Sequence, residues 1–333
     1  MTRPPVETVG DLGEFGLIDR VVARGGTARV TEVGPGDDAA VLRAPDGRVV
    51  ATTDVLVEGR HFRRDWSTGT DVGHKAAAAN LADIAAMGAV PTALLVGLAC
   101  PPGTPVAWLE EIADGLAAEC APLGAAVVGG DTVASAPGSD AVVLSVTALG
   151  DLAGRRPVLR SGARPGDVLA VAGQLGRSAC GLAVLHRGSR SPRAAVQAHL
   201  RPTPPYAAGP AAADAGASAM CDVSDGLLAD VGHLAAASGV VVEIDPTALR
   251  AWVVEPLPQV GAALGVDPLA WVLTGGEDHA LVATFPPHAA VPAGWTAIGT
   301  VRAGEPTVLV DGRPAARVAA ELGGGGTGHV HFG

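Results

Sequence analysis

The chain has 333 residues, of which 48% are hydrophobic and 17% charged, and its 23 basic and 34 acidic side chains give a formal net charge of −11. These figures predict a soluble globular protein of about two domains. The acidic balance, with Lys75 as its single lysine, argues against nucleic-acid binding, because phosphate-binding surfaces are basic. Four scattered cysteines and no secretory signal predict reduced thiols in a cytoplasmic protein that does not bind a membrane.

Strands and helices are expected to alternate along the first half of the chain. Apolar spacing and glycine or proline stops give the expected elements. Strands are expected at 49–54, 92–99, 125–131 and 141–149, and helices at 72–87 and 106–120. The polar, arginine-rich segment 150–166 is broken by glycine and proline, which is typical of a domain boundary. We therefore expect an N-terminal domain at 1–150 and a C-terminal domain at 151–333.

The second half continues the same mixture of elements. The pattern predicts strands at 167–173, 240–245 and 279–285, and helices at 178–186 and 226–238. No fixed-period repeat is present, which excludes solenoids and propellers. Mixed order in both halves predicts α/β or α+β layering.

Several carboxylates stand beside glycine turns where apolar strands begin or end. Solvated surface charge explains most acidic residues in such a chain. It explains less well a set that recurs at the ends of apolar runs, namely Asp37, Asp38, Asp54, Asp131, Asp222, Asp225, Glu277 and Asp278. These residues are candidates for a shared site.

Asp83 is unusual because the surrounding run, AAAANLADIAAMGA, is almost entirely apolar. A carboxylate in a buried helix needs a compensating partner, and Asn80 lies on the same helical face. The alternative is that Asp83 faces water. Lys75 lies two turns away along the helix, so an intrahelical ion pair explains it poorly.

Carboxylates that converge need cations, because two unit charges 4 Å apart repel by ~4 kcal/mol near a protein surface. The chain offers almost no lysine for this purpose. Asp, Thr and backbone oxygens suit Mg²⁺, which commonly shares its coordination sphere with substrate phosphates. The working hypothesis is a phosphate-handling enzyme.

Each turn also has a simpler interpretation. Ser224 or Asp225 could cap the helix that begins near Gly226, and the glycines of GGD and GGED could serve only the backbone of a turn. Thr52 and Thr53 could be ordinary strand residues. No Walker A or protein-kinase signature is present, so a P-loop enzyme is excluded.

Eight motifs in chain order resemble the thiamine-monophosphate kinase family. They are GEFGLI (13–18), GPGDDAAVL (34–42), TTDVLVEGRHF (52–62), GHKAAAANLADIAAMGAVP (73–91), VVGGDT (127–132), RSGARPGD (160–167), DVSDGLLADVGHL (222–234) and GGEDHALV (275–282). That family is similar to the aminoimidazole-ribonucleotide synthetase superfamily. The resemblance implies an N-terminal mixed sheet with helices that binds ATP and metal and forms a homodimer, followed by a C-terminal α+β domain. It also implies that ATP phosphorylates thiamine monophosphate to thiamine diphosphate.

The resemblance implies three groups of site residues. Contacts to several Mg²⁺ ions fall on Asp38, Thr52, Thr53, Asp54, Asp83, Asp131, Asp222 and Asp225. Contacts to ATP, the co-substrate, fall on Gly130, Asp131, Arg160 and Ser224. Contacts to thiamine monophosphate fall on His61, Glu277 and His329.

Two positions depart from the family's pattern. His279 stands where the family usually has Tyr after GGED, and His329 stands where it has an aromatic residue that helps to hold the thiamine rings. The acceptor phosphate has a second pKa near ~6 and is largely ionised at neutral pH, so no general base is expected. We expect direct in-line transfer without a phospho-enzyme.

Three rival activities share part of this pattern. Selenophosphate synthetases resemble this chain but carry a reactive cysteine or selenocysteine near the N-terminus, whereas the first cysteine here is Cys100. The hydrogenase-maturation dehydratase ends in a cysteine, whereas this chain ends HVHFG. A two-metal phosphatase would also use clustered aspartates, but would release inorganic phosphate without an acceptor.

Overall fold

The computed structural model describes residues 6–35, 39–323 and 326–329. It divides into two compact units, and each is described by itself. The first unit comprises Met1–Ile84 and Val90–Ala153, and the second comprises Ala85–Ala89 and Gly154–Gly333. No helix among the described residues is long and apolar enough to cross a membrane.

A four-stranded mixed sheet forms the first unit, in the order β3-β6-β4-β5. Its strands are β3 (Val50–Val57), β4 (Val90–Cys100), β5 (Ala126–Ala134) and β6 (Val143–Asp151). Only the β4–β5 pair is parallel. Along β6, Leu144, Val146 and Ala148 are buried, whereas the residues between them are half-exposed. This alternation shows that one face of the sheet is covered and the other is not.

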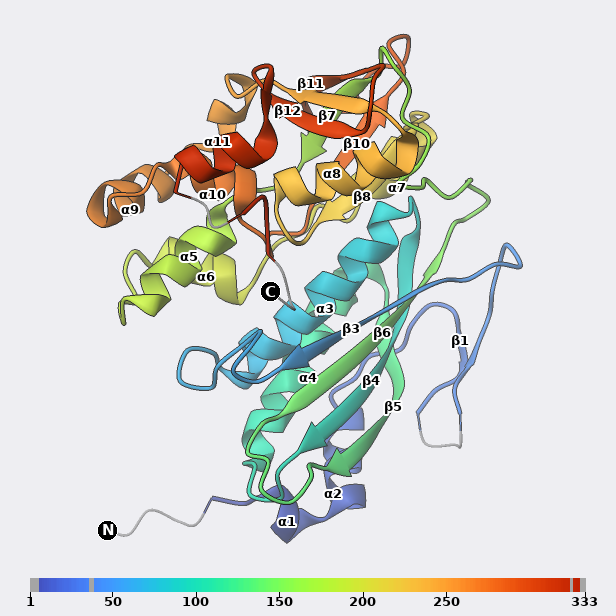
Figure 1. Ribbon diagram of the computed structural model, residues 1–333. Helices are drawn as coiled ribbons and strands as arrows, with labels where there is room; N and C mark the ends of the chain where they lie inside the picture. The colour runs from blue at the N-terminus through green and yellow to red at the C-terminus, as the bar shows by residue number, and fades with distance from the viewer. Residues whose placement is uncertain (1–5, 36–38, 324–325, 330–333) are drawn as a thin grey trace. The chain divides into compact units, whose positions relative to one another are not determined.

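Helices α3 (Gly69–Ala86) and α4 (Val106–Cys120) lie against the covered face (Figure 1). The two helices approach backbone to backbone, because a Cβ placed on Gly73 would lie 2.0 Å from the carbonyl oxygen of Ile112. Only glycine permits this contact, which brings α3 and α4 close together. The remaining elements of this unit are α1 (Val9–Leu12), α2 (Glu14–Val22), β1 (Thr31–Val33), β2 (Val41–Leu42) and the 3₁₀ helix Ala121–Leu123.

The second unit contains a seven-stranded sheet in the order β13-β12-β9-β11-β7-β10-β8. Its strands are β7 (Val168–Ala172), β8 (Ala219–Val223), β9 (Val241–Ile244), β10 (Ala280–Phe285), β11 (Trp295–Arg302), β12 (Thr307–Val310) and β13 (Arg313–Pro314). Only β9 and β12 pair in parallel. Every residue of β10 is buried, which fits its largely apolar sequence and its place between β7 and β8.

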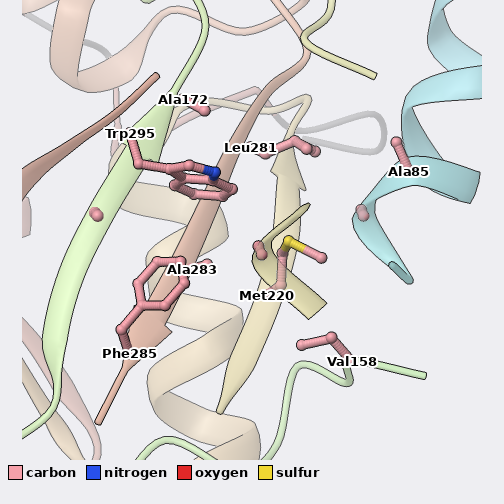
Figure 2. Packing of buried hydrophobic residues seen from close by; sticks show 11 residues of the cluster. Ala85, Val158, Ala172, Met220, Leu281, Ala283, Phe285 and Trp295 are labelled. Carbon is pink, nitrogen blue, oxygen red and sulfur yellow. The ribbon is translucent and has the colours of Figure 1, made fainter. Parts of the chain in front are cut away.

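Helices and one aromatic cluster complete the second unit. The helices are α5 (Arg177–His186), α6 (Arg193–Leu200), α7 (Ala208–Asp214), α8 (Leu227–Ser238), α9 (Leu257–Leu264), α10 (Pro268–Thr274), α11 (Ala315–Glu321) and the 3₁₀ helix Ala248–Trp252. Helices α7, α8 and α11 contact the strands of the sheet directly. Figure 2 shows Phe285 and Trp295 packed edge to face, with ring centroids 5.4 Å apart, beside Met220 and Ala283. This core fixes β8 and β10, the strands that carry the acidic turns.

The expected fold class is confirmed: both units are mixed sheets with helices. The helix expected at 106–120 matches α4, whereas α3 begins three residues before the expected start at 72. Its start is set by Thr68, whose backbone and hydroxyl both donate to the Asp71 carboxylate, at 2.9 and 2.8 Å. This reciprocal cap is the start signal that the apolar spacing does not contain. The sequence pattern also did not predict α6, α9, α10, α11 or strands β11 to β13.

Candidate functional site

Strand β3 and helix α3 place two predicted metal ligands together in the first unit. The Thr52 hydroxyl donates to the Asp83 carboxylate at 2.7 Å. Beside this bond, the backbone N–H of Asp54 donates to Asn80 Oδ1 at 3.1 Å. Asn80 is fully buried and its amide donates to the Ala76 carbonyl at 2.9 Å. Asp83 is therefore half-buried and hydrogen-bonded, which disfavours the surface-charge alternative.

The loop that follows β3 carries His61, the first residue predicted to contact the thiamine substrate. His61 Nδ1 accepts the N–H of Val57 at 3.0 Å, so the neutral ring carries its proton on Nε2. The Lys75 ammonium, only 5% exposed, donates to the His61 carbonyl oxygen at 3.3 Å. The lone lysine of the chain thus supports the loop that presents His61.

Thr53 and Asp131 lie on the uncovered face of the same sheet. Thr53 pairs with Thr147, whose hydroxyl donates to Thr53 Oγ1 at 3.1 Å. Asp131 pairs with Gly97 and, through Ser145, shares a row across the sheet with Val55. Side chains alternate between faces along a strand.

Asp54 lies between Thr53 and Val55 on β3, so its side chain points to the other face of the sheet, toward the helices. Three strand spacings also separate β3 from β5, about 14 Å. In the first unit of a single chain, Asp131 therefore does not lie close to Asp54 and Asp83. Gly130, beside Asp131, is exposed, and Asp38 lies outside the described residues.

Two turns come together in the second unit, where β8 ends and β10 begins. The Glu277 N–H donates to the Ser224 carbonyl at 2.8 Å, and the His279 N–H donates to the Val223 carbonyl at 3.2 Å. A Cβ on Gly276 would lie 2.3 Å from the Ser224 oxygen, so glycine is required for this backbone contact. Asp222, Ser224 and Glu277 thereby become neighbours.

The backbone of the second turn is strained on both sides of Asp278. Glu277 and His279 have φ values of 63° and 52°, a region that non-glycine residues rarely adopt. His279 Nδ1 lies 3.2 Å from Asp222 Oδ2, and both side chains are buried. The histidine that replaces the family's usual tyrosine therefore contacts a predicted metal ligand.

Asp230 completes the first turn, although the sequence analysis did not single it out. Its Oδ2 accepts the N–H groups of Asp225 and Gly226, each at 3.0 Å. No side chain at the N-cap of α8 accepts a bond there, so neither Ser224 nor Asp225 serves as a cap. Burial, with the nearby Asp222 charge, raises the pKa of Asp230 to about 7.

Asp225, Asp230 and His233 form the group of three potential metal-ligating side chains found in the described part of the chain, with ligand atoms within 4.8 Å of one another. A groove of about 670 Å³ adjoins them and is lined also by His329. The backbone N–H of His329 donates to the Asp225 carbonyl at 3.0 Å. The structure therefore brings two predicted residues, Asp225 and His329, to one groove.

Arg160 is exposed in the second unit. Its neighbour Leu159 accepts the N–H of Met220 on β8, and its own carbonyl accepts the Ser238 hydroxyl at 3.1 Å. These bonds hold the arginine's backbone beside β8, the strand that contains Asp222.

A second buried acid, Asp278, lies behind Glu277. Its Oδ1 accepts the N–H of Ser178 at the start of α5 at 2.9 Å, and its Oδ2 is a buried atom without a hydrogen-bond partner among the described residues. Burial raises its pKa to about 7. A protonated carboxyl is favoured where the charged form would be this poorly solvated.

Comparison with known proteins identifies the family to which this chain belongs. The chain matches the AIR synthase related protein, N-terminal domain, over residues 36–152 and the corresponding C-terminal domain over residues 164–309. It is 52% identical to the thiamine-monophosphate kinase of Mycobacterium tuberculosis over 92% of this chain and 90% of that protein. It is 42% identical to the Corynebacterium glutamicum enzyme of the same name, over 88% and 87%. The chain belongs to the thiamine-monophosphate kinase family.

A solved thiamine-monophosphate kinase, described as AaThiL complexed with AMPPCP and TMP, shares this fold with a TM-score of 0.75 at 34% identity. That match covers 96% of this chain and 98% of the solved one. Hydrogenase maturation protein HypE, at 19% identity and a TM-score of 0.70, shares the fold alone. Membership of a kinase family, and of the two-domain fold predicted with it, is thus confirmed.

Two of the buried polar residues that support this kinase's predicted ligands, Asp230 and His199, were not predicted from the sequence, whereas Asp278 was among the candidate carboxylates. Asp230 stands inside the recognised motif DVSDGLLADV, and its signal is its position one helical turn after the glycine. His199 gives no signal, because it lies in a helix that the sequence pattern did not predict. Such supporting residues become visible only when the turns are placed together.

Proposed function

We propose that the protein transfers the terminal phosphoryl group of ATP directly to thiamine monophosphate, with Mg²⁺, and releases thiamine diphosphate and ADP. The observation that carries this proposal is 52% identity to a thiamine-monophosphate kinase across nine-tenths of both chains. The similar structure described as complexed with AMPPCP and TMP supports the same two substrates. Four free, buried cysteines support the further proposal of a cytoplasmic location.

The donor chemistry of the predicted ligands fits Mg²⁺. The β3–α3 group offers hydroxyl and carboxylate oxygens from Thr52, Asp54 and Asp83, without nitrogen or sulfur. Asp222 and Asp225 offer two more carboxylates in the second unit. Oxygen donors of this kind suit Mg²⁺, and not zinc. When bound, Mg²⁺ would neutralise phosphate charge and align the two reacting phosphates.

The chain's own residues would position the two substrates and would not remove a proton from the acceptor phosphate. The acceptor phosphate is already ionised at neutral pH, so the site requires no general base. Arg160 would supply a fixed positive charge to an ATP phosphate, with Gly130, Asp131 and Ser224 as further ATP contacts. His61, whose neutral ring carries its proton on Nε2, would contact the acceptor phosphate, and Glu277 would contact the cationic thiamine.

His329 would take the place of the family's ring-stacking aromatic residue. It is exposed at the groove that Asp225 and His233 also line. An imidazole has a flat face on which an aromatic ring can stack. The proposal for His329 thus rests on its location as well as on the resemblance.

We propose further that a second copy of the chain covers the open face of the first unit's sheet. That face exposes Val55 by 48%, Leu95 by 38% and Val133 by 52%, and such a group of exposed apolar side chains on one face is typical of an interface. Asp131 and Thr53 lie on the same face. Any role of Asp131 toward ATP or metal would therefore be performed at this interface.

The dimer proposal is tested by Val55→Arg. An arginine buried within an interface lacks a partner, so we expect a monomer in sedimentation equilibrium where the wild type is expected to be a dimer. The matched control is Val254→Arg, at a 44% exposed position in the second unit, which leaves the mass unchanged. A dimeric Val55→Arg protein would show that another surface holds the two copies together.

The proposed reaction is tested by incubating the purified protein with MgATP and thiamine monophosphate. We expect thiamine diphosphate and ADP in equal amounts, measured by chromatography. ADP with free phosphate alone would indicate a phosphatase or ATPase instead. Thiamine diphosphate formed equally well after the metal is chelated would contradict the role of Mg²⁺. Replacing thiamine monophosphate with selenide tests the selenophosphate-synthetase alternative.

A further inference from the structure

A buried hydroxyl and a buried imidazole lie behind Glu277, on helices α5 and α6. Ser178 Oγ and His199 Nδ1 are 3.0 Å apart, and the two residues are 0% and 4% exposed. The same Nδ1 lies 3.4 Å from Glu277 Oε2. His199 thus stands between a buried serine and the carboxylate proposed to contact thiamine.

The backbone of Glu277 is fixed, whereas its side chain needs further support. Its N–H is bonded to Ser224, and its φ of 63° holds it in the left-handed region. The side chain, 35% exposed, has three rotatable bonds, and ordering such a chain on binding costs conformational entropy. A neighbour that orders the carboxylate beforehand removes part of this cost.

His199 has the chemistry for this role. When Nδ1 of His199 carries a proton, it can donate to Glu277 Oε2. The Ser178 hydroxyl lies close enough to the same nitrogen to restrict rotation of the imidazole ring. Ser178 is itself anchored, because its N–H donates to the buried Asp278 carboxyl. A continuous set of contacts therefore links the α5 N-terminus to both acids of the GGED turn.

We propose that His199 is a positioning residue that orders the Glu277 carboxylate for the cationic thiamine part of the substrate. This inference rests on the proposed function, in which Glu277 contacts thiamine monophosphate. It assigns to α6 a part in substrate affinity that none of the recognised motifs contains. His199 does not take part in phosphoryl transfer, so its effect is confined to binding.

The experiment compares steady-state kinetics of His199→Ala and His199→Asn with the wild type. We expect His199→Ala to raise KM for thiamine monophosphate about tenfold, the equivalent of one hydrogen bond to a charged group. The kcat value and KM for ATP should change less than about twofold, because the groups around ATP are untouched. His199→Asn places an amide N–H near the position of Nδ1 and should restore most of the affinity.

A double-mutant cycle tests whether His199 acts through Glu277. Glu277→Gln alone should raise KM for thiamine monophosphate, and adding His199→Ala should then raise it little further. The matched control is Val196→Ala, a buried position of the same helix, which weakens packing but should leave KM unchanged. Thermal unfolding measured on every variant checks that each one is folded. If His199→Ala does not fold, His199→Asn takes its place in the kinetic comparison.

The outcomes separate the two proposals. A wild type that binds ATP but forms no thiamine diphosphate overturns the proposed function and this inference with it. An active wild type, in which Glu277→Gln raises KM and neither His199 variant does, overturns only the inference. Additive effects in the double mutant, or an equal KM change in Val196→Ala, would show that His199 merely supports the fold.

Discussion

The two acidic regions of this protein are built in different ways. In the first unit, Thr52 and Asp54 lie on a regular strand and Asp83 lies on a regular helix, with hydrogen bonds of 2.7 and 3.1 Å between the two elements. In the second unit, Asp225, Glu277 and Asp278 lie on two turns whose backbones touch, and Glu277 and His279 have positive φ. Regular elements hold one region, and strained turns hold the other.

This difference predicts how each region responds to substitution. A side chain on a regular strand or helix can be replaced without disturbing the backbone that carries it. In the second unit, Asp230 accepts backbone N–H groups of the first turn, and Asp278 links the second turn to the start of α5 by accepting the Ser178 N–H. Function and stability should therefore be separable in the first unit and coupled in the second.

The largest effect is expected from Asp83→Asn. Removing one carboxylate charge from the proposed Mg²⁺ site should reduce kcat at least about 100-fold, on the scale of losing one electrostatic contact to the transition state. The amide still accepts the Thr52 hydroxyl, so the free energy of unfolding should change by less than about 1 kcal/mol. Kinetics and urea unfolding, measured on one preparation, check both expectations.

Asp114→Asn is the control for that substitution. Asp114 is an exposed acid of α4 that pairs with Arg24 at 2.8 Å, and its loss should alter neither rate nor stability appreciably. Full activity in Asp83→Asn would return Asp83 to a purely structural role. Unfolding of Asp83→Asn would contradict the separation of function from stability in the first unit.

The next effect tests the turns of the second unit. In Gly276→Ala, the new Cβ would meet the Ser224 oxygen at 2.3 Å, so the two turns must move apart. We expect a loss of about 1–3 kcal/mol in the free energy of unfolding, together with reduced activity. Gly232→Ala on α8 is the control, because its nearest neighbouring atom is 4.0 Å away. Equal stability of both variants would show that the turn contact is not tight.

The sequence predicts these two regions to different depths. Glycine turns at strand ends, and an acid within an apolar helix, are visible as patterns, so Asp54, Asp83 and Asp222 can be identified from the sequence alone. Their supports are less visible. Asn80 shares a helical face with Asp83, but its partner Asp54 lies 26 residues away on another element. Asp230 shows in the sequence only as an acid one helical turn after Gly226, and its hydrogen bonds to the turn appear only in the structure.

The face on which Asp131 lies also depends on three-dimensional information. The register of β5 against β4 shifts between Leu94 and Leu95, so alternation in sequence could not place the side chain. The pairing of the strands places Asp131 on the face of the sheet opposite to the face that carries Asp54. A motif therefore predicts that Asp131 matters, whereas only the pairing of strands shows where it acts.

The smallest effect concerns pH and the second unit. Burial raises the pKa of Asp278 to about 7 from its ordinary value of 3.8. Between about pH 4 and pH 7 the folded protein therefore holds a proton that the unfolded chain has released. Its contribution to stability is complete below pH 4 and is lost as the pH rises to 7, with a slope of at most about 1.4 kcal/mol per pH unit.

Asp278→Asn should reduce this slope, because asparagine cannot titrate and its side-chain oxygen still accepts the Ser178 N–H. Some slope should remain, since burial also raises the pKa of Asp230 to about 7. Urea unfolding from pH 5 to 8 measures the change, and Asp140→Asn, at an exposed position of the first unit, should leave the slope as it is. A slope that stays the same in Asp278→Asn would show that this carboxyl is already ionised at pH 5, and that the strained turn does not couple stability to its protonation.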